Sequence, residues 1–388
     1  MRLLILNYEY PPLGGGMGVV SRFHAEGLSR EGHKVTVLTT WFQGEKEIAQ
    51  EGNLQIIKLK SKRRYTYKST PDEWISWIRA SKKFLKKHLV EHTYDMCMAH
   101  FALPAGEVAA FAKRKFHLPY VVISHGQDIP WFFPKQMFKY HLFTYFWIKK
   151  ICRNSEKLIL LTQAMKKNAD RFMGKYKDQN TIIPNGFESK EFYPDYSLKK
   201  KTFTLLFVGR LVAQKDPFTF LKALKILAKA ELPFKAHIAG DGPLRKKMEN
   251  FVRQHRLAEY VTFKGWLSKK EMLHEYQSAS LQVISSKAEA MSIAALESLA
   301  CGQFIISTPV SGNTDMIREG INGSFFKYSD AETLAQKIKA FYTDYFLQDY
   351  RLSESDIRDF KQKFDWKHII SLLQKELLVL SSKEEKEQ

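Results

Sequence analysis

The chain of 388 residues has few cysteines and no long apolar run. Its three cysteines, Cys97, Cys152 and Cys301, are odd in number, widely spaced and fit no zinc-ligand or disulfide pattern. No stretch approaches the roughly 18 consecutive apolar residues of a transmembrane helix. The apolar stretch after Met1 is too short for a signal peptide and predicts a first strand instead. We therefore expect a cytoplasmic protein with reduced thiols.

Acidic residues are outnumbered by basic ones. The 61 Lys and Arg residues exceed the 41 Asp and Glu residues, which gives a formal net charge of +20. Such an excess is typical of proteins that bind nucleic acid, an anionic membrane or phosphate-bearing substrates. The sequence carries no zinc-finger, RNA-binding or helix-turn-helix signature, so we do not expect nucleic acid as a partner. It also lacks an Asp-x-Asp pair, and we expect neither a metal ion nor a cofactor.

A strand–loop–helix alternation occurs twice along the chain. The first copy opens with an apolar strand at 3–6, and the second opens at 203–208, after a charged segment at 188–201. Alternating strands and helices predict parallel sheets with helices on both faces. The length suffices for two such cores. We predict an α/β protein of two Rossmann-like, doubly wound domains at 1–190 and 191–350, followed by helices at 351–388.

Two glutamates, Glu289 and Glu297, flank the start of a short apolar helix. A buried strand at 281–286 precedes them, and Cys301-Gly302 ends the helix. Ligands of open α/β sheets bind beyond the carboxyl ends of strands, where this loop would lie. At about 1.5 Å per residue the two carboxylates lie roughly 12 Å apart, near the span from ribose to sugar in a sugar nucleotide. Carboxylates accept hydrogen bonds from such hydroxyls, although Glu289 could simply favour the helix N-terminus and Glu297 could be solvated.

Arg210 and Lys215 follow the strand at 203–208 directly. Gly209 precedes the arginine, and Gly240 begins a Gly-Asp-Gly-Pro turn after the next strand. Arginine offers a planar fork to phosphate oxygens and lysine a point charge. At the end of a strand the two can neutralise a diphosphate. The alternative, two ordinary surface cations, leaves the accompanying glycines unexplained.

The first loop of the chain is rich in glycine. Gly14, Gly15 and Gly16 follow a double proline and precede a helix at 19–30. Consecutive glycines let backbone N–H groups approach an anion or a sugar closely. A flexible turn is the simpler interpretation. A dinucleotide fingerprint is disfavoured by the prolines and by the absence of an acid ending the second strand.

These motifs resemble, over nearly the whole chain, those of the retaining glycosyltransferases of family 4. The resemblance rests on the Glu289–Glu297 spacing, Arg210 and Lys215, the Pro-Pro-x-Gly-Gly-Gly run at 11–16 and the Pro-Asn-Gly motif at 184–186. It implies the GT-B fold, in which two Rossmann-like domains face a cleft, the N-terminal one binds the acceptor, and the terminal helix crosses back to it. It further implies retaining transfer of a hexose or N-acetylhexosamine from a nucleoside diphosphate sugar, and we expect UDP rather than GDP.

The resemblance also assigns roles to residues. His125, at the end of the strand at 119–125, would lie near the donor sugar, and His100, at a similar strand end, is interpreted as a decoy. The resemblance places the diphosphate on Arg210 and Lys215, the transferred sugar near Glu289 and the ribose on Glu297. Further substrate-binding positions are Gly15, Gly16, Gly240, Met291, Ser292 and Ile293. The family often has glycine where this chain has Ala290-Met291-Ser292, so the choice of sugar does not carry over.

Two segments of the first domain combine apolar and basic residues. A predicted helix at 73–92 gathers a basic stripe on one face: Arg79, Lys82, Lys83, Lys86 and Lys87. The segment Phe132–Lys150 is dense in aromatic and basic residues. Each could be a solvated or packed helix face, or a membrane-surface contact. We expect a sugar or lipid-linked acceptor and reversible, peripheral binding to the anionic inner face of the cell membrane.

Two other functions fit parts of this pattern. A sugar-nucleotide epimerase of the same fold would need no acceptor, and a non-enzymatic basic protein could bind membranes or nucleic acid. The second leaves Arg210, Lys215 and the paired glutamates without a purpose. The sequence therefore favours glycosyl transfer to a hydroxyl acceptor, in cell-surface polysaccharide or glycolipid synthesis.

Overall fold

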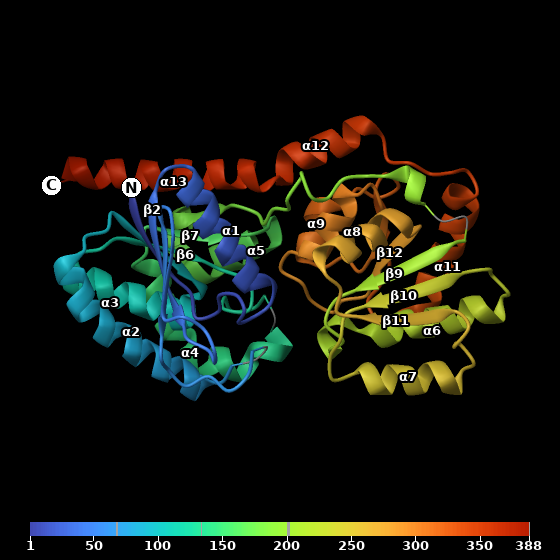
Figure 1. Ribbon diagram of the computed structural model, residues 1–388, viewed down its shortest axis with the longest axis horizontal. Coiled ribbons are helices and arrows are strands. Elements are labelled where there is room, and N and C mark those ends of the chain that lie inside the picture. Colours follow the sequence, from blue (N-terminus) through green and yellow to red (C-terminus); the bar gives the residue numbers. More distant parts are fainter. Residues whose placement is uncertain (67–68, 133, 200–201, 388) are drawn as a thin grey trace. The chain divides into compact units, whose positions relative to one another are not determined.

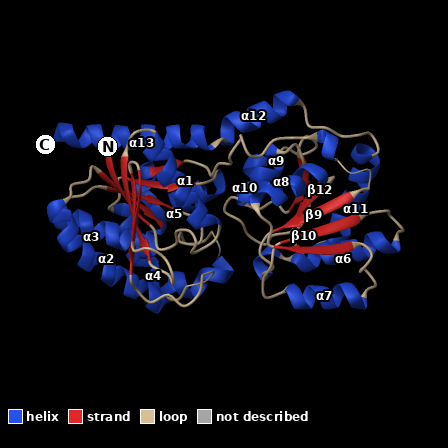
Figure 2. Cartoon of the chain, viewed as in Figure 1, coloured by secondary structure: helices blue, strands red, loops and turns tan. Residues whose placement is uncertain are grey.

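The computed structural model describes residues 1–66, 69–132, 134–199 and 202–387 (Figure 1). The chain divides into two compact units. Met1–Asn185 and the chain from Trp366 onward form unit 1, and Gly186–Asp365 forms unit 2. The chain thus passes between units at 185/186 and 365/366, compared with the predicted boundaries of 190/191 and 350/351. Each unit has its own sheet with helices packed against it (Figure 2).

Unit 1 is built on a sheet of order β3-β4-β2-β1-β5-β6-β7-β8. All its neighbouring strands are parallel except β3 and β4. The strands of β1 and β5 are buried on both faces, as continuous apolar runs predict. The strands are β1 (Arg2–Leu6), β2 (Lys34–Thr40), β3 (Ile48–Glu51), β4 (Leu54–Leu59), β5 (Met96–His100), β6 (Tyr120–Ile123), β7 (Lys157–Leu160) and β8 (Asn180–Ile182).

Helices cover both faces of this sheet, as right-handed connections between parallel strands require. The helices are α1 (Gly16–Arg30), α2 (Pro71–Glu91), α3 (Glu107–Phe116), α4 (Pro134–Arg153), α5 (Gln163–Met173) and α13 (Trp366–Glu387), with short turns η1 (Phe101–Gly106) and η2 (Gly174–Gln179). Helix α1 begins three residues earlier than predicted, at the glycine loop itself.

The terminal helix α13 packs on unit 1, against α1. A Cβ atom added to Gly27 of α1 would lie 2.5 Å from Ile370 Cγ1, so the two helices meet at the glycine. His33 and Gln374 form a side-chain hydrogen bond of 3.1 Å. The sequence predicted that all helices from 351 onward return to the first domain. In the structure α13 does so, whereas α12 (Glu354–Phe364) belongs to unit 2, where Phe360 stacks on Phe187.

Unit 2 is a six-stranded, fully parallel sheet of order β11-β10-β9-β12-β13-β14 within the described residues. Its strands are β9 (Thr204–Val208), β10 (Lys235–Ala239), β11 (Val261–Gly265), β12 (Leu281–Ile284), β13 (Phe304–Ser307) and β14 (Gly323–Phe325). Its helices are α6 (Pro217–Lys229), α7 (Arg245–Gln254), α8 (Lys269–Ser278), α9 (Ile293–Ala300), α10 (Ser311–Met316), α11 (Ala331–Phe341) and α12, with short turns η3 (Tyr196–Leu198), η4 (Ala213–Lys215) and η5 (Tyr342–Phe346).

The strand order of unit 2 reverses at β9. From β9 the chain proceeds outward to β10 and β11, and then returns to the other side of β9 to begin β12. Such a reversal opens a crevice at the carboxyl ends of the two central strands, because their loops leave toward opposite faces. The prediction of two parallel-sheet α/β domains is confirmed, and the ligand-binding edge of unit 2 falls at β9 and β12.

Candidate active site

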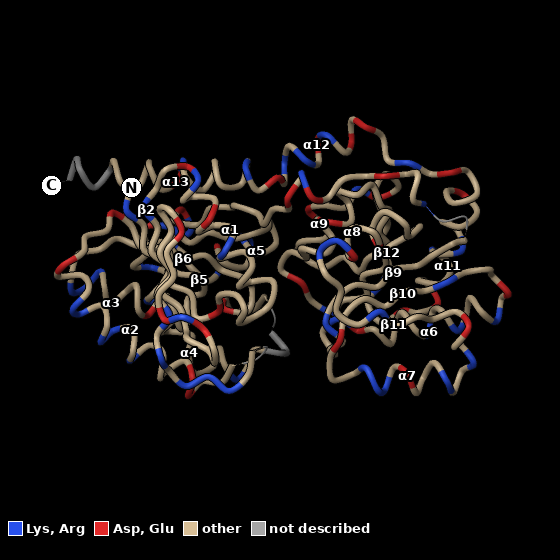
Figure 3. The backbone as a smooth tube through the Cα atoms, viewed as in Figure 1, with Lys and Arg blue, Asp and Glu red and all other residues tan. Residues whose placement is uncertain are grey.

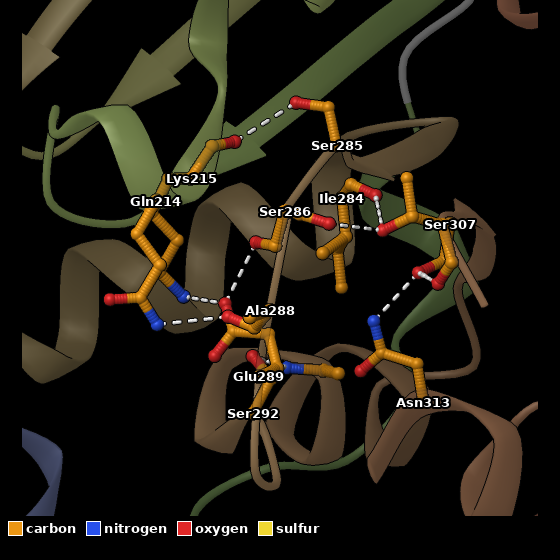
Figure 4. A network of polar contacts seen from close by, with 12 residues as sticks. Gln214, Lys215, Ile284, Ser285, Ser286, Ala288, Glu289, Ser292, Ser307 and Asn313 are labelled. Carbon is orange, nitrogen blue, oxygen red and sulfur yellow. Dashed lines mark hydrogen bonds and ion pairs between the residues drawn. The ribbon is translucent and has the colours of Figure 1, made fainter. Parts of the chain in front are cut away.

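The loops that follow β9 and β12 meet in an ion pair. Lys215, the last residue of η4, contacts Glu289 through Nζ and Oε1 (Figure 4). The side chains are only 20% and 10% exposed, respectively. The structure therefore brings together two residues that lie 74 positions apart and that the sequence predicted independently.

Serine hydroxyls at the end of β12 hold this arrangement. Ser286 Oγ donates to Glu289 Oε1 at 2.7 Å. Ser285 Oγ lies 3.1 Å from the carbonyl oxygen of Lys215 (Figure 4). It also lies 2.7 Å from the carbonyl oxygen of Asp216, at the start of α6. Both serines were predicted only as part of a buried strand. Their place in the sequence indicated a site role, since hydroxyl residues at the carboxyl end of an apolar strand lie at the ligand edge of a parallel sheet.

The backbones of the two loops are also joined. Gln214 Nε2 donates to the carbonyl oxygen of Ala288 at 2.8 Å, and the backbone N–H of Lys287 donates to the carbonyl oxygen of Gln214 at 2.8 Å. Reciprocal bonds of this kind fix both loops before any ligand arrives. Pre-positioned charges can stabilise a developing negative charge without reorganising at the moment of reaction.

Arg210 is the exposed cation of this site. It leaves the sheet directly after β9, and no hydrogen bond or ion pair ties its guanidinium to another residue of the described ranges. Gly240 shapes the loop beneath it: its φ is +127°, and a Cβ there would lie 2.1 Å from the carbonyl oxygen of Gly209. Gly240 is therefore required for the close approach of two loops, while Arg210 remains available to a ligand.

The N-terminus of α9 follows Glu289. Ser292 caps the helix, because its Oγ accepts a hydrogen bond from the backbone N–H of Ala295 at 3.3 Å. Met291 is buried, and a Cβ on Gly312 would lie 2.5 Å from its Cα, so the first turn of α10 packs tightly on this backbone. The first-turn N–H groups of a helix carry partial positive charge. The predicted amides of Met291, Ser292 and Ile293 thus lie at a helix start beside Glu289.

Glu297 lies within α9 and has different partners. Its Oε2 accepts a hydrogen bond of 3.0 Å from the hydroxyl of Tyr276 in α8. Loss of hydration raises the pKa of Glu297 to about 7, against the stabilising hydrogen bond from Tyr276 and the charge of Lys269. A hydroxyl that donates a hydrogen bond to this carboxylate stabilises its charged form. The partners of Glu297 differ from those of Glu289, so the two acids have separate environments.

In unit 1 the predicted His125 follows β6, which ends at Ile123, two residues earlier than expected. Its Nε2 lies 3.0 Å from Nδ1 of His100, and the two rings stack. Burial lowers the pKa of His125 to about 3, so its imidazole is neutral. Of the two facing nitrogens, one donates the hydrogen bond and the other accepts it. His100, predicted to be a decoy, is the hydrogen-bonding partner of His125, because parallel pairing of β5 with β6 brings both strand ends together.

Asp128 holds the loop that carries His125, and the sequence analysis missed it. Its carboxylate accepts hydrogen bonds from Ser124 Oγ at 2.7 Å, from the backbone N–H of Ala102 at 2.8 Å and from that of His125 at 3.2 Å. It is fully buried among these donors. The sequence His-Gly-x-Asp contained the signal, because an acid three residues after a strand end can close the turn on itself.

The glycine loop begins α1. Gly15 is the N-cap residue, and a Cβ there would meet no atom within 4 Å, so its backbone faces open space. Gly16 is exposed as the first helical residue. The positions of this loop that require glycine for steric reasons are Gly14 and Gly18. Gly14 has a φ of +85°, and a Cβ on Gly18 would lie 2.8 Å from the carbonyl oxygen of Leu13.

Known proteins match both units of the chain. The family model described as "Glycosyltransferase Family 4" matches residues 14–191, and that described as "Glycosyl transferases group 1" matches residues 189–356. An uncharacterized glycosyltransferase of Methanocaldococcus jannaschii is 27% identical over 76% of this chain and 78% of its own. The glycogen synthase of Mycobacterium tuberculosis is 24% identical over 95% of this chain and 92% of its own.

Solved structures share the fold. The sucrose-phosphate synthase of Thermosynechococcus elongatus matches with a TM-score of 0.87 and 19% identity, over 99% of this chain and 100% of that one. Anabaena HepE, solved in complex with UDP and glucose, matches with a TM-score of 0.77 and 17% identity, over 97% of this chain and 99% of that one. The two family models together span 14–356 across both α/β units, and the chain is a glycosyltransferase of the GT-B fold that belongs to family 4.

Proposed function

We propose that this glycosyltransferase moves a hexose or N-acetylhexosamine from a nucleoside diphosphate sugar to a hydroxyl acceptor, with retention of anomeric configuration. The observation that carries the proposal is the Lys215–Glu289 pair at the β9–β12 edge, with the exposed Arg210 directly after β9. Two cations suit a diphosphate, and a carboxylate beside them suits the hydroxyls of the attached sugar.

The leaving diphosphate would be neutralised without a dedicated metal ion. A lysine ammonium has three donor hydrogens, so Lys215 can hold Glu289 and a phosphate oxygen together. The exposed Arg210 offers its fork to the same group. Both cations act most strongly in the transition state, when charge collects on the diphosphate as its bond to the anomeric carbon breaks.

Retention would follow from attack on the face that the diphosphate leaves. The acceptor oxygen forms its bond to the anomeric carbon, the bond to the diphosphate oxygen breaks, and the acceptor proton passes to that diphosphate oxygen. Glu289, held by Ser286 through Oε1, orients the transferred sugar through its other oxygen. His125 of unit 1 is kept neutral by burial, which suits it to a hydrogen bond with an uncharged hydroxyl.

The donor proposed is a UDP-sugar. Anabaena HepE, of the same fold, was solved with UDP and glucose. In this chain, Glu297 would accept the ribose hydroxyls, and the start of α9 would face the phosphates. For the acceptor we propose a growing polysaccharide or a lipid-linked sugar, used on the cytoplasmic side of the membrane. The Mycobacterium relative named as a glycogen synthase extends a polysaccharide by name, which fits the first choice.

A nucleotide panel tests the donor assignment directly. Thermal unfolding is measured with UDP, GDP, ADP and no nucleotide, and the stabilisation expected is specific to UDP. Incubation with a UDP-sugar alone then distinguishes transfer from epimerisation, because an epimerase releases epimer or free nucleotide without an acceptor. With an acceptor present, NMR of the product reports the anomeric configuration. Inversion, or stabilisation by none of the nucleotides, would contradict the proposal.

A further inference from the structure

Helix α4 of unit 1 presents large apolar side chains to solvent. The exposed fractions are 65% for Phe138, 62% for Leu142, 83% for Phe143, 82% for Phe146 and 42% for Trp147. Their spacing of four, one, three and one residues places them on one side of the helix. Single exposed apolar residues are ordinary, but a contiguous apolar face of this kind marks a contact surface.

The opposite side of α4 is anchored in the unit. Ile148, Ile151 and Cys152 are fully buried, and His141 Nε2 contacts the carbonyl oxygen of Gln127 at 3.0 Å. The exposed aromatic residues therefore cannot turn inward without unpacking the helix. Of the predicted segment Phe132–Lys150, Phe133 lies outside the described residues, and the apolar face runs from Phe138 to Trp147.

The charges on the same helix are of one sign. The 20 residues of α4 include three lysines in the segment described with side chains, Lys139, Lys149 and Lys150, together with Arg153, and no Asp or Glu. Lys139 and Lys150 are exposed and form no ion pair with the described residues. An apolar face edged by cations and free of carboxylates suits a surface that is both apolar and anionic.

Helix α2 adds further cations beside α4. Arg79, Lys83, Lys86 and Lys87 are exposed along it, and Figure 3 shows basic residues on this helix. Glu107 of α3 ties the helices together, because it accepts from Lys82 at 2.6 Å and from Trp147 Nε1 at 2.7 Å. The predicted stripe of five thus loses one member: Lys82 serves an internal ion pair, and four cations remain available.

We propose that the α4 face, Phe138, Leu142, Phe143, Phe146 and Trp147, inserts into the headgroup region of an anionic lipid bilayer, with the α2 and α4 cations on the lipid phosphates. An interfacial helix of this type lies in the membrane plane, with aromatic residues inserted and basic residues at the headgroups. Among the described residues, no helix is long and apolar enough to cross a bilayer, so contact through one helix face is the geometry available.

Charge argues against a second copy of the chain as the occupant. In a two-fold dimer the same patch meets itself, so the cations of α4 would face their own copies. With a net charge of +20 and no acid on α4, that contact would be repulsive. A bilayer containing anionic lipid supplies both the apolar depth and the opposite charge. Each basic residue near such a surface strengthens binding about fivefold.

Vesicle flotation of the full-length protein tests the inference without donor or acceptor. Phosphatidylcholine vesicles with and without phosphatidylglycerol are compared at low and physiological salt. We expect binding to the anionic vesicles that weakens as salt screens the surface. The pair Phe143→Ser and Phe146→Ser should lower the partition coefficient about tenfold for each side chain removed. Lys139→Gln with Lys150→Gln should lower it about 30-fold and flatten the salt dependence.

A matched control removes exposed apolar side chains elsewhere. Ile48 is 59% exposed in β3 and Leu347 is 58% exposed in unit 2, so Ile48→Ser with Leu347→Ser should leave vesicle binding unchanged. Equal loss in this control, or wild-type binding by the α4 variant, would overturn the inference. So would a dimer of the wild type that only the α4 variant abolishes, or absence of vesicle binding at low salt. Stabilisation by UDP is measured in parallel, and its absence alone would count against the proposed donor only.

Discussion

At the scale of single residues, the site depends on charges that the structure holds before a ligand arrives. Lys215 and Glu289 are largely buried and paired, and Arg210 is exposed beside them. Removing one member of such a pair costs more than its own contact, because the partner charge is left unpaired in a poorly hydrated place. Functional effects at these positions are therefore best judged together with unfolding measurements.

Arg210→Ala and Lys215→Ala should each lower kcat/KM about 100-fold, since removal of one preorganised charge typically costs about 3 kcal/mol of transition-state stabilisation. Arg210→Ala should leave the melting temperature unchanged. Lys215→Ala should lower the melting temperature, because it leaves the buried charge of Glu289 without its partner. Steady-state kinetics and thermal unfolding are measured on the same preparations. Lys229→Ala, on an exposed turn of α6, serves as the control cation. Wild-type turnover in either variant would remove the diphosphate assignment.

Glu289→Gln and Glu297→Gln should separate transfer from nucleotide binding. Glu289 lies beside Lys215 and should mainly affect the transfer rate, whereas Glu297, placed against Tyr276, should mainly affect UDP affinity. Calorimetry with UDP gives the affinities, and turnover is measured at saturating donor. The same loss of UDP affinity in both variants would show that the roles are not divided.

UDP affinity should rise with pH through the titration of Glu297. Burial raises its folded pKa to about 7, whereas the ionised carboxylate accepts from ribose hydroxyls more strongly than the protonated acid does, so tight binding releases the proton. The same raised pKa means that the folded state holds this proton more tightly than the unfolded chain, so this group's contribution to stability falls as pH rises from 4.5 to about 7. Calorimetry one unit below and one unit above that pKa should show about tenfold tighter binding on the alkaline side. A pH-independent affinity in wild type, or the same slope in Glu297→Gln, would refute the link.

At the scale of elements, loops carry the site and strands bring the loops together. The β9 loop and the β10 loop approach so closely that Gly240 lies on the backbone of Gly209. This contact fixes the backbone just before Arg210, although neither glycine needs to contact a ligand. A change in the β10 loop should therefore affect the diphosphate site through the position of its neighbour.

Gly240→Ala should destabilise the protein by about 2–4 kcal/mol, because the new Cβ would lie 2.1 Å from a carbonyl oxygen at a φ of +127°. Gly32→Ala is the matched control: its φ is +88° in the turn that ends α1, but a Cβ there meets nothing within 4 Å. The control should cost about 1 kcal/mol, from backbone strain alone. Urea unfolding of both variants checks the difference, and equal losses would mean that the loop contact does not matter.

At the scale of the whole molecule, the two units differ in how the chain builds them. Unit 2 is one continuous segment with its own aromatic core, which includes Phe203, Phe207 and Phe220. Unit 1 needs both ends of the chain, since α13 buries Ile369, Ile370, Leu373 and Leu377. The first unit is thus incomplete without a helix made last.

A fragment of residues 186–365 should accordingly fold by itself, with cooperative unfolding and stabilisation by UDP. A fragment of residues 1–185 should expose the apolar surface of α1 that α13 covers, and should aggregate or unfold readily. Circular dichroism, light scattering and thermal unfolding of the two fragments provide the comparison. A stable, monomeric 1–185 fragment would show that α13 contributes little to unit 1.

The sequence by itself determined the class of fold and the main chemistry. Apolar strands alternating with amphipathic helices required two parallel-sheet units, since no other arrangement buries such strands on both faces. Arg210, Lys215 and Glu289 were evident because glycines and strand ends accompany them, and these signals are local in the chain. Helix faces could be predicted for the same reason, as the buried face of α2 shows.

Only the tertiary structure decided which of these residues meet. Strand order placed β9 beside β12 and so paired Lys215 with Glu289, although the two residues lie 74 positions apart and β10 and β11 lie between them in the chain. Parallel pairing of β5 with β6 made His100 the partner of His125, and Glu107 removed Lys82 from the basic stripe. The exposure of Phe143 and Phe146 was equally beyond the sequence, because aromatic residues suit a core and a surface alike until packing shows which side of α4 is covered.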